Sequence, residues 1–254
     1  MKMKKILSVV LALACVLSFT ACGPKEEKKA DGKDGKETLV MATNAEFPPY
    51  EYWENQKIVG IDAEFAEAIA EKLGMELKIE DMAFDSIIMA VKSGKADIGV
   101  AGMTVDETRL KQVDFSDTYY TGRQVIIVTE DSEIAAPADL AGKKIGVQQG
   151  TTGDIFTTDE FGDECINRFN KGMEAVQALS QGKIDAVVID DQPAKTFVGQ
   201  VEGLKILETE YVEEDYAMAV KKGNTELLEK VNKAIEELKA DGTFDKIVDK
   251  YITD

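Results

Sequence analysis

Histidine is missing from this chain, and cysteine, proline and tryptophan are scarce. The 254 residues include no histidine, three cysteines, five prolines and one tryptophan. Histidine is the commonest acid–base residue and metal ligand, so its absence removes most catalytic triads and zinc sites. The sequence also has no HExxH, GxSxG, Walker, CxxC or GxGxxG signature. These absences favour a binding protein over an enzyme, and we expect neither a metal site nor a cofactor.

Long hydrophobic runs are missing too, apart from one at the N-terminus. Residues 6–19 are apolar, follow a start with three lysines and end at small residues. The run is shorter than the roughly 20 residues that a bilayer requires, so residues 1–21 are predicted to be a secretory signal peptide. A cysteine directly after the small residues resembles the lipobox of bacterial lipoproteins, which implies lipidation of Cys22. Phe19 stands where that pattern usually has leucine, and an ordinary secretory signal is the alternative.

Residues 22–37 read as a tether between this anchor and a folded domain. Apart from Cys22 they consist almost entirely of glycine and charged residues, with Ala30 as their one apolar side chain after it. Such a composition cannot bury enough surface to fold. We therefore expect the folded part to begin near Thr38 and the membrane to be contacted through the lipid alone.

Charge and cysteine content restrict the partners further. Without residues 1–21 the chain carries 27 basic and 48 acidic side chains, a formal charge of −21. This acidity argues against nucleic acid and against electrostatic docking on anionic lipid. Cys15 lies in the predicted signal, so Cys165 is the one cysteine left beside Cys22. It lacks a histidine to activate it and is interpreted as a packing residue.

Strand and helix patterns alternate along the rest of the chain. Short apolar runs predict strands, and stripes of period 3.6 that end at glycines predict helices. Asp62 and Thr104 are predicted to cap two of these helices, the second through a T-x-x-E capping box with Glu107. The predicted strands are 39–43, 77–79, 97–100, 143–147 and 184–189. The predicted helices are 62–73, 85–93, one from residue 104, 172–181, one from residue 225 and one around 244–251. This alternation predicts mainly parallel sheets covered by helices.

A short internal repeat divides the pattern in two. Residues 93–98 (SGKADI) resemble residues 181–186 (QGKIDA), each a helix stop followed by lysine and an aspartate that opens a strand. Residues 124–129 and 215–220 are candidates for strands that cross between two lobes. We therefore predict lobe 1 from residues 38–123 plus 218–254 and lobe 2 from residues 124–217.

Polar residues gather where three predicted strands end, and open α/β sheets bind ligands at such ends. Ala101, Gly102 and Thr104 follow one strand, and Arg109 lies close behind with a bidentate fork for a carboxylate. The alternative is that Thr104 only caps its helix and that Arg109 is a surface cation.

The other two strand ends carry complementary groups. Residues 148–153 (QQGTTG) follow the second strand, and such a loop presents backbone N–H groups to an anion. An ordinary glycine turn is the alternative there. Asp190 ends the third strand and could meet an ammonium, although an aspartate at such a position taken alone is more often a helix cap. An anion clamp and a cation partner together suit a zwitterionic amino acid.

Several ordered segments resemble the polar amino acid family of ABC-transporter solute-binding proteins, over residues 38–254. The segments that carry the resemblance are 42–52 (ATNAEFPPYEY), 60–62 (GID), 82–85 (MAFD), 101–104 (AGMT) with Arg109, 113–116 (VDFS), 149–152 (QGTT) and the strand into Asp190. The resemblance implies the two-lobed type II periplasmic binding fold, with two hinge strands, and a monomer.

The resemblance also implies roles for individual residues. Arg109 would bind the ligand carboxylate, with backbone N–H groups of Thr104 and Thr152. The Gly102 carbonyl, the Thr104 hydroxyl and Asp190 would bind the ammonium.

The side-chain end of the ligand is implied to lie between Phe47 and Phe84. Asn44 stands where related proteins often have an acid that reads the distal group of the ligand. A neutral amide there weakens the case for a purely basic ligand without excluding it, and Glu46 and Gln148 could compensate. Glutamine, arginine, lysine, cystine and other polar amino acids remain open.

The resulting hypothesis is an extracytoplasmic import receptor that delivers its amino acid to an ABC permease. No ATP site is expected in this chain. One rival is an enzyme of the same fold, similar to the dehydratases of aromatic amino acid synthesis, for which Asp190 is the sole candidate acid. The other rival is a sensor subunit that presents its ligand-bound form to a signalling receptor.

Overall fold

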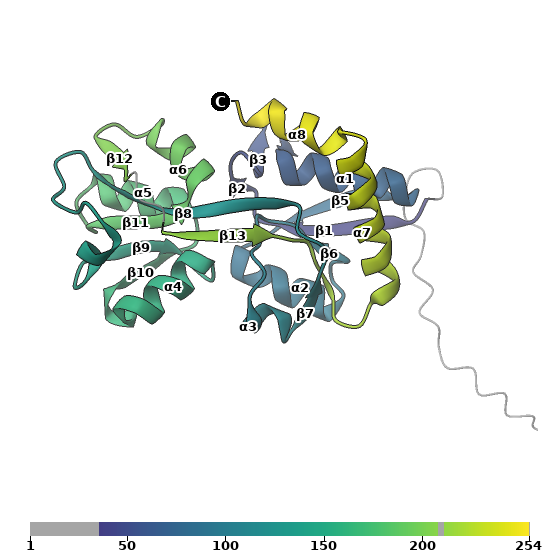
Figure 1. Cartoon of the computed structure of the whole chain (residues 1–254), viewed down its shortest axis with the longest axis horizontal. Coiled ribbons are helices and arrows are strands. Elements are labelled where there is room, and N and C mark those ends of the chain that lie inside the picture. The colour runs from purple at the N-terminus through teal and green to yellow at the C-terminus, as the bar shows by residue number, and fades with distance from the viewer. Residues whose placement is uncertain (1–35, 208–210, 254) are drawn as a thin grey trace, which may run out of the picture.

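The computed structural model describes residues 36–207 and 211–253 and places two sheets side by side along the long axis of the molecule (Figure 1). The predicted signal peptide 1–21, Cys22 and residues 23–35 of the predicted tether lie outside the described residues. Within the described part, no helix is long and apolar enough to cross a membrane.

The sheet of lobe 1 has the strand order β5-β1-β6-β14-β7. Its strands are β1 (Thr38–Thr43), β5 (Glu76–Asp81), β6 (Ile98–Gly99), β7 (Val113–Phe115) and β14 (Ala219–Lys221). Parallel pairing joins β1 to β5 and β6, whereas β14 runs antiparallel to both of its neighbours. A separate hairpin sheet consists of β2 (Glu46–Phe47), β3 (Glu51–Glu54) and β4 (Lys57–Val59).

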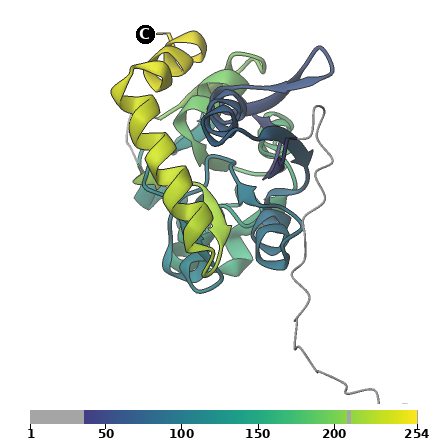
Figure 2. The ribbon, with the colours of Figure 1, turned by 90° about the vertical axis from the view of Figure 1, so that its right-hand side faces the viewer.

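Helices cover both faces of this sheet because β1 is apolar on both sides. Leu39 and Met41 pack in one cluster with Phe65, whereas Ala42 packs in a second cluster with Ile87. The helices on these faces are α1 (Ile61–Leu73), α2 (Ile87–Ser93), α7 (Thr225–Ala240) and α8 (Thr243–Tyr251), with η2 (Phe84–Ser86) before α2. Figure 2 shows α7 running diagonally across the outer end of the lobe. A sheet covered on both faces leaves the strand ends as the place for a ligand.

The sheet of lobe 2 has the order β10-β9-β11-β8-β12, with β13 also paired to β8. Its strands are β8 (Tyr120–Thr129), β9 (Ile145–Gln148), β10 (Ile166–Phe169), β11 (Ala186–Asp190), β12 (Leu204–Ile206) and β13 (Val212–Tyr216). Its helices are α4 (Thr152–Phe161), α5 (Gly172–Ser180) and α6 (Asp191–Val198), with short helices η3 (Pro137–Leu140) and η4 (Asp163–Cys165). Both large sheets are therefore mixed: the parallel strands are joined by antiparallel ones, which the predicted mainly parallel sheets did not include.

Two strands run between the lobes. The ten-residue β8 extends from the middle of the molecule into lobe 2, and β13 lies antiparallel to it with Tyr216 opposite Tyr120 (Figure 1). The first crossing thus begins four residues before the predicted 124–129. The predicted second crossing, 215–220, is divided between β13 and β14. The two-lobed α/β fold is confirmed, and the exact lobe boundaries stay a prediction.

Two predicted helix caps are wrong. Helix α1 has Gly60 at its N-cap position, and Asp62 lies buried in its first turn. No helix begins at Thr104, which forms an isolated β-bridge with Tyr216. Helix α3 (Glu107–Leu110) begins later, and its cap is Asp106, whose Oδ1 accepts from the backbone N–H groups of Thr108 and Arg109 at 2.7 and 2.9 Å. The helix is therefore capped by Asp106 and not by the predicted capping box of Thr104 and Glu107.

Candidate ligand-binding site

A small, largely enclosed cavity lies between the two lobes at the carboxyl ends of their strands. Lobe 1 contributes residues from the ends of β1 and β6, from the hairpin, from η2 and from α3, and lobe 2 contributes the ends of β9 and β11 and the start of α4. The lining residues are Asn44, Phe47, Glu51, Phe84, Ala101, Gly102, Thr104, Arg109, Gln148, Thr151, Thr152 and Asp190. All ten predicted site residues are thus brought together.

Arg109 is fixed at one side of the cavity. Its side chain is almost fully buried, and its guanidinium donates to the carbonyls of Thr104 at 2.6 Å and Gly150 at 3.0 Å. Its Nε lies 3.1 Å from Oδ2 of Asp106, and the guanidinium stacks 5.4 Å from the centre of the Phe84 ring. Burial lowers the pKa of Arg109, and nearby carboxylates act in the opposite direction. These contacts hold the fork in one orientation, so little entropy is lost when it meets an anion.

Asp190 lies on the lobe 2 side and belongs to a buried polar network. Its Oδ2 accepts from Nε2 of Gln124 at 2.8 Å, and its Oδ1 accepts from the Tyr216 hydroxyl. Burial first, and then the Glu214 carboxylate, raise the pKa of Asp190 well above its usual value. Asp190 occupies the N-cap position of α6, but its side chain makes no capping bond. The carboxyl group therefore faces the network and the cavity.

Amide and carboxyl groups occupy a third part of the cavity wall. Nε2 of Gln148 donates to Oδ1 of Asn44 at 2.8 Å, and Nδ2 of Asn44 donates to the Met82 carbonyl at 2.8 Å. Glu51 is fully buried, and neither of its carboxyl oxygens has a hydrogen-bond donor among the described residues. Burial, followed by the nearby Asp62 carboxylate, raises the pKa of Glu51 well above its usual value.

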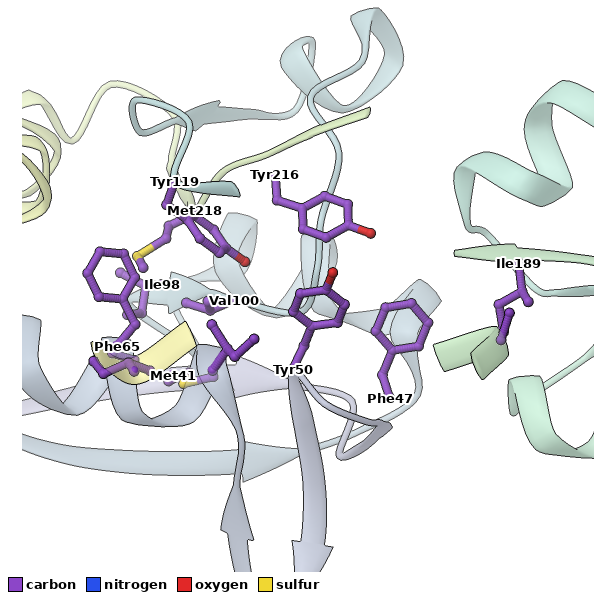
Figure 3. Close-up of a cluster of buried hydrophobic side chains, with 14 of the residues drawn as sticks. Met41, Phe47, Tyr50, Phe65, Ile98, Val100, Tyr119, Ile189, Tyr216 and Met218 are labelled. Carbon is purple, nitrogen blue, oxygen red and sulfur yellow. The ribbon is translucent and has the colours of Figure 1, made fainter. Parts of the chain in front are cut away.

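Aromatic side chains complete the wall. Phe47 stacks on Tyr50 with their ring centres 5.8 Å apart. Figure 3 shows these two rings on the side of the lobe 1 cluster that faces Ile189 of lobe 2. Phe84 contributes the ring beneath the Arg109 guanidinium. Apolar walls with a few convergent polar groups are typical of sites for small organic ligands.

Polar contacts join the two lobes around the cavity. Lys171 forms an ion pair with Glu46 at 2.5 Å, and Nε2 of Gln149 donates to Asp85 at 2.9 Å. The bonds from Gln148 to Asn44 and from Arg109 to Gly150 also cross between the lobes. The structure therefore represents a closed arrangement of the two lobes.

Residues 39–254 match the family model of the bacterial extracellular solute-binding proteins, family 3. The chain belongs to this family. The solute-binding protein is 36% identical over 257 residues to the "Arginine-binding extracellular protein ArtP" of Bacillus subtilis (strain 168), across 99% of both chains. It is also 33% identical over 226 residues to the "L-arginine-binding protein" of Pseudomonas aeruginosa, across 84% of this chain and 87% of that one.

Solved structures agree with this assignment. An ancestral arginine-binding protein bound to glutamine superposes on the solute-binding protein with a TM-score of 0.81 and 45% identity, over 86% of this chain and 99% of that one. An ancestral arginine-binding protein bound to arginine gives the same TM-score, identity and coverage. The P235GK mutant of ArgBP from T. maritima gives a TM-score of 0.80 and 41% identity, over 84% and 94% of the two chains.

Two lining residues of the solute-binding protein were not predicted, Glu51 and Thr151. Both lie inside segments that carry the resemblance, and Thr151 lies in the predicted anion-binding loop. Glu51 follows a proline pair in the hairpin, and nothing in its local pattern distinguishes it from the other acidic residues. Glu46, named as a possible substitute for a distal acid, does not line the cavity and pairs with Lys171 instead.

Proposed function

We propose that this solute-binding protein captures a free polar amino acid between its lobes, with arginine as its preferred ligand, and performs no catalysis. The observation that carries the proposal is the composition of one closed cavity. A buried guanidinium, Arg109, lies on its lobe 1 side and a buried carboxyl, Asp190, on its lobe 2 side. A third group, Glu51, brings to the same cavity a buried carboxyl that lies beside the Asp62 carboxyl and has no hydrogen-bond donor among the described residues.

Each charged group of the ligand then has a partner. Arg109 binds the α-carboxylate together with backbone N–H groups of Thr104 and Thr152, and Asp190 binds the α-ammonium. The aliphatic part of the side chain passes between Phe47 and Phe84.

The distal end of the ligand meets Glu51 and the Asn44–Gln148 pair. A guanidinium supplies several donors to these oxygens, and its charge offsets the cost of ionising the buried Glu51 carboxyl. The neutral Asn44 therefore does not argue against arginine, because a carboxyl comes from the hairpin instead. The names of the relatives support a basic ligand, and glutamine in the ancestral protein supports tolerance of an amide.

The transport role extends this proposal beyond the described residues. Closure by an amino acid that bridges the lobes would create the surface that an ABC permease recognises, because the ligand binds the closed form more tightly. Related proteins in Escherichia coli are named as ABC transporter arginine-binding proteins. We further propose that the mature chain works outside the cytoplasm as a monomer and carries a lipid on Cys22. We place one hinge between residues 120 and 124, where the chain first crosses from lobe 1 to lobe 2.

The test is calorimetric titration of the domain, stripped of bound ligand by unfolding and refolding, with each standard amino acid, ornithine and cystine. We expect tight one-to-one binding of arginine and loss of binding in Arg109→Ala, with the exposed Lys111→Ala as the control. The ligand should be recovered chemically unchanged after long incubation. A folded protein that binds none of these compounds would overturn the proposal.

The same titration tests the assignment of Glu51. Glu51→Gln removes the carboxyl and keeps its shape, so arginine should bind about 10- to 100-fold more weakly, the usual range for a hydrogen bond to a charged group. Glutamine should be affected much less. Glu54→Gln, which is exposed on the same strand, is the matched control. Equal losses for arginine and glutamine would show that Glu51 supports the fold rather than reads the side chain.

A further inference from the structure

Two buried carboxyl groups, Asp190 and Glu214, share one hydrogen-bond donor beside the cavity. Nε2 of Gln124 donates to Oδ2 of Asp190 at 2.8 Å and to Oε2 of Glu214 at 3.0 Å. The two acidic residues are 4% and 3% exposed. Gln124 lies on β8, between β11 with Asp190 and β13 with Glu214. The hydroxyl of Thr104 donates to Glu214 at 3.0 Å, and that of Tyr216 donates to Asp190.

No cation of the described residues bonds directly to this pair. Neither carboxyl forms an ion pair with any cation in the part of the chain that the structure describes. Arg109 acts on both electrostatically, but none of its N–H groups donates to either carboxyl: three of them are directed at two carbonyls and Asp106, and the remaining two are available to the ligand. Oε1 of Glu214 has no donor within the described residues. Two buried, neighbouring carboxyl groups cannot both stay ionised at low cost, so one of them holds a proton.

The other titratable groups that face the pair do not supply the missing charge. They are Tyr50 and Tyr216, whose pKa values burial raises well above their usual value, Glu51, and Asp191. Asp191 is next to Asp190 in sequence but has its own cations, with Arg123 at 3.4 Å and Lys195 at 3.6 Å. The phenols stay neutral near pH 7, so a cation that bonds directly to the pair has to arrive with the ligand.

We propose that Glu214 is a positioning residue for recognition of the ligand ammonium. Together with Gln124, Glu214 causes the Asp190 carboxyl to hold one proton in the ligand-free protein. The incoming ammonium displaces this proton into solvent. In this exchange the ammonium keeps its three protons and forms an N–H···O bond to the Asp190 carboxylate. The O–H bond of the carboxyl group breaks, and water or buffer takes the proton. This inference rests on the proposed function, since it assigns the ammonium to Asp190.

Proton release follows from this exchange in a measurable way. Binding that releases a proton becomes tighter as the pH rises, by up to about tenfold in Kd per pH unit while the site is protonated. Glu214→Gln keeps the shape and the hydrogen bonds to Thr104 and Gln124 but removes the second acid. Asp190 would then ionise more readily, so less proton is released and the pH dependence of Kd becomes shallower.

The first experiment is calorimetric titration of the full mature chain with L-arginine at pH 7 in buffers of different ionisation enthalpy. The second is measurement of Kd over a range around neutrality, from about pH 5.5 to about pH 8.5. The wild type, Glu214→Gln and the matched control Glu213→Gln, exposed on the same strand, are compared. Any proton from Glu51 is released in all three proteins, so the difference between them is the readout. Circular dichroism and melting curves establish that each variant is folded.

We expect the observed binding enthalpy to depend on the buffer in the wild type and in Glu213→Gln, with the dependence at least halved in Glu214→Gln. Arginine binding with no buffer dependence in the wild type would overturn this inference and leave the proposed function in place. An unchanged dependence in Glu214→Gln would also overturn it. Failure of the wild type to bind arginine or any other amino acid would instead remove the proposed function, and the inference with it.

Discussion

Burial changes the chemistry of single carboxyl groups in this protein, and Asp62 illustrates it well. Its side chain is fully buried, accepts from the backbone N–H of Gly102 at 2.7 Å, and accepts from the Tyr119 hydroxyl at 2.9 Å. Burial raises its pKa from 3.8 to about 6, although these hydrogen bonds act in the opposite direction. Gly102 lines the cavity, so a carboxylate that is costly to keep ionised holds part of the ligand site in place.

This residue makes stability depend on pH. The folded state binds the Asp62 proton more tightly than the unfolded chain, so its contribution to the free energy of unfolding falls as the pH rises from about 4 to 6. From the shift between 3.8 and about 6, the loss amounts to about 3 kcal/mol. Asp62→Asn removes it, so we expect the variant to gain stability relative to the wild type across this range, with a constant difference above about pH 7.

Urea unfolding of the ligand-stripped wild type and Asp62→Asn at a series of pH values measures this difference. The control is Asp117→Asn, which makes the same chemical change at an exposed position. A difference between wild type and Asp62→Asn that does not change with pH would contradict the assigned pKa.

At the scale of elements, the crossing strands β8 and β13 combine the hinge with the ligand site. Gly122 of β8 lies opposite Glu214, and a Cβ added at Gly122 would lie 2.3 Å from the Tyr216 hydroxyl. That hydroxyl donates to Asp190. The absence of a side chain at Gly122 therefore lets Tyr216 cross the strand and reach the carboxyl group.

We expect Gly122→Ala to displace the Tyr216 ring and to weaken amino acid binding, because Asp190 loses a donor and its position. Loss of one such hydrogen bond to a charged group corresponds to about 1.5–3 kcal/mol, or roughly 10- to 150-fold in Kd. Calorimetry measures the affinity, and the control is Thr121→Ala, an exposed change of the neighbouring residue. Wild-type affinity in Gly122→Ala would contradict the role given to this contact.

At the scale of the whole molecule, side-chain contacts between the lobes stabilise the closed arrangement. The Lys171–Glu46 ion pair joins α5's cap to the hairpin strand β2, and Gln149 joins β9's end to Asp85 of η2. Lys171 and Glu46 are partly exposed, with 45% and 35% of their side-chain surfaces accessible. Solvent and salt screen such a pair, which limits its contribution to the range of about 0.2–1 kcal/mol.

Lys171→Ala should therefore shift the lobes toward an open arrangement and raise the Kd for arginine by at most about fivefold. The effect should come through closure rather than direct contact, so every ligand should be affected equally. Small-angle X-ray scattering of the ligand-stripped protein should show a larger radius of gyration. The control is Lys230→Ala, which breaks the Lys230–Glu226 pair within α7. A change in ligand preference would show instead that Lys171 reads the side chain.

Local sequence signals were sufficient wherever an element depends on its own residues. Gly74 and Gly94 end α1 and α2 in the left-handed conformation, as their positions after apolar stripes predicted. The predicted strands at 39–43 and 184–189 are both present, because continuous apolar runs can be buried on both faces. The polar residues at three strand ends were also predicted to form one site, because open α/β sheets bind ligands at the carboxyl ends of their strands.

What the sequence determined by itself was therefore the two-lobed α/β fold and ten of the twelve residues around the cavity. Only the tertiary structure decided what each buried acid does. Asp62 bonds to Gly102 rather than capping its helix, Thr104 donates to Glu214, and Glu51 enters the cavity from the hairpin. The partners of these groups lie as many as 110 residues away in the chain, so no local pattern marks them. Their protonation depends on burial and on neighbouring charges, which exist only after the two lobes have packed together.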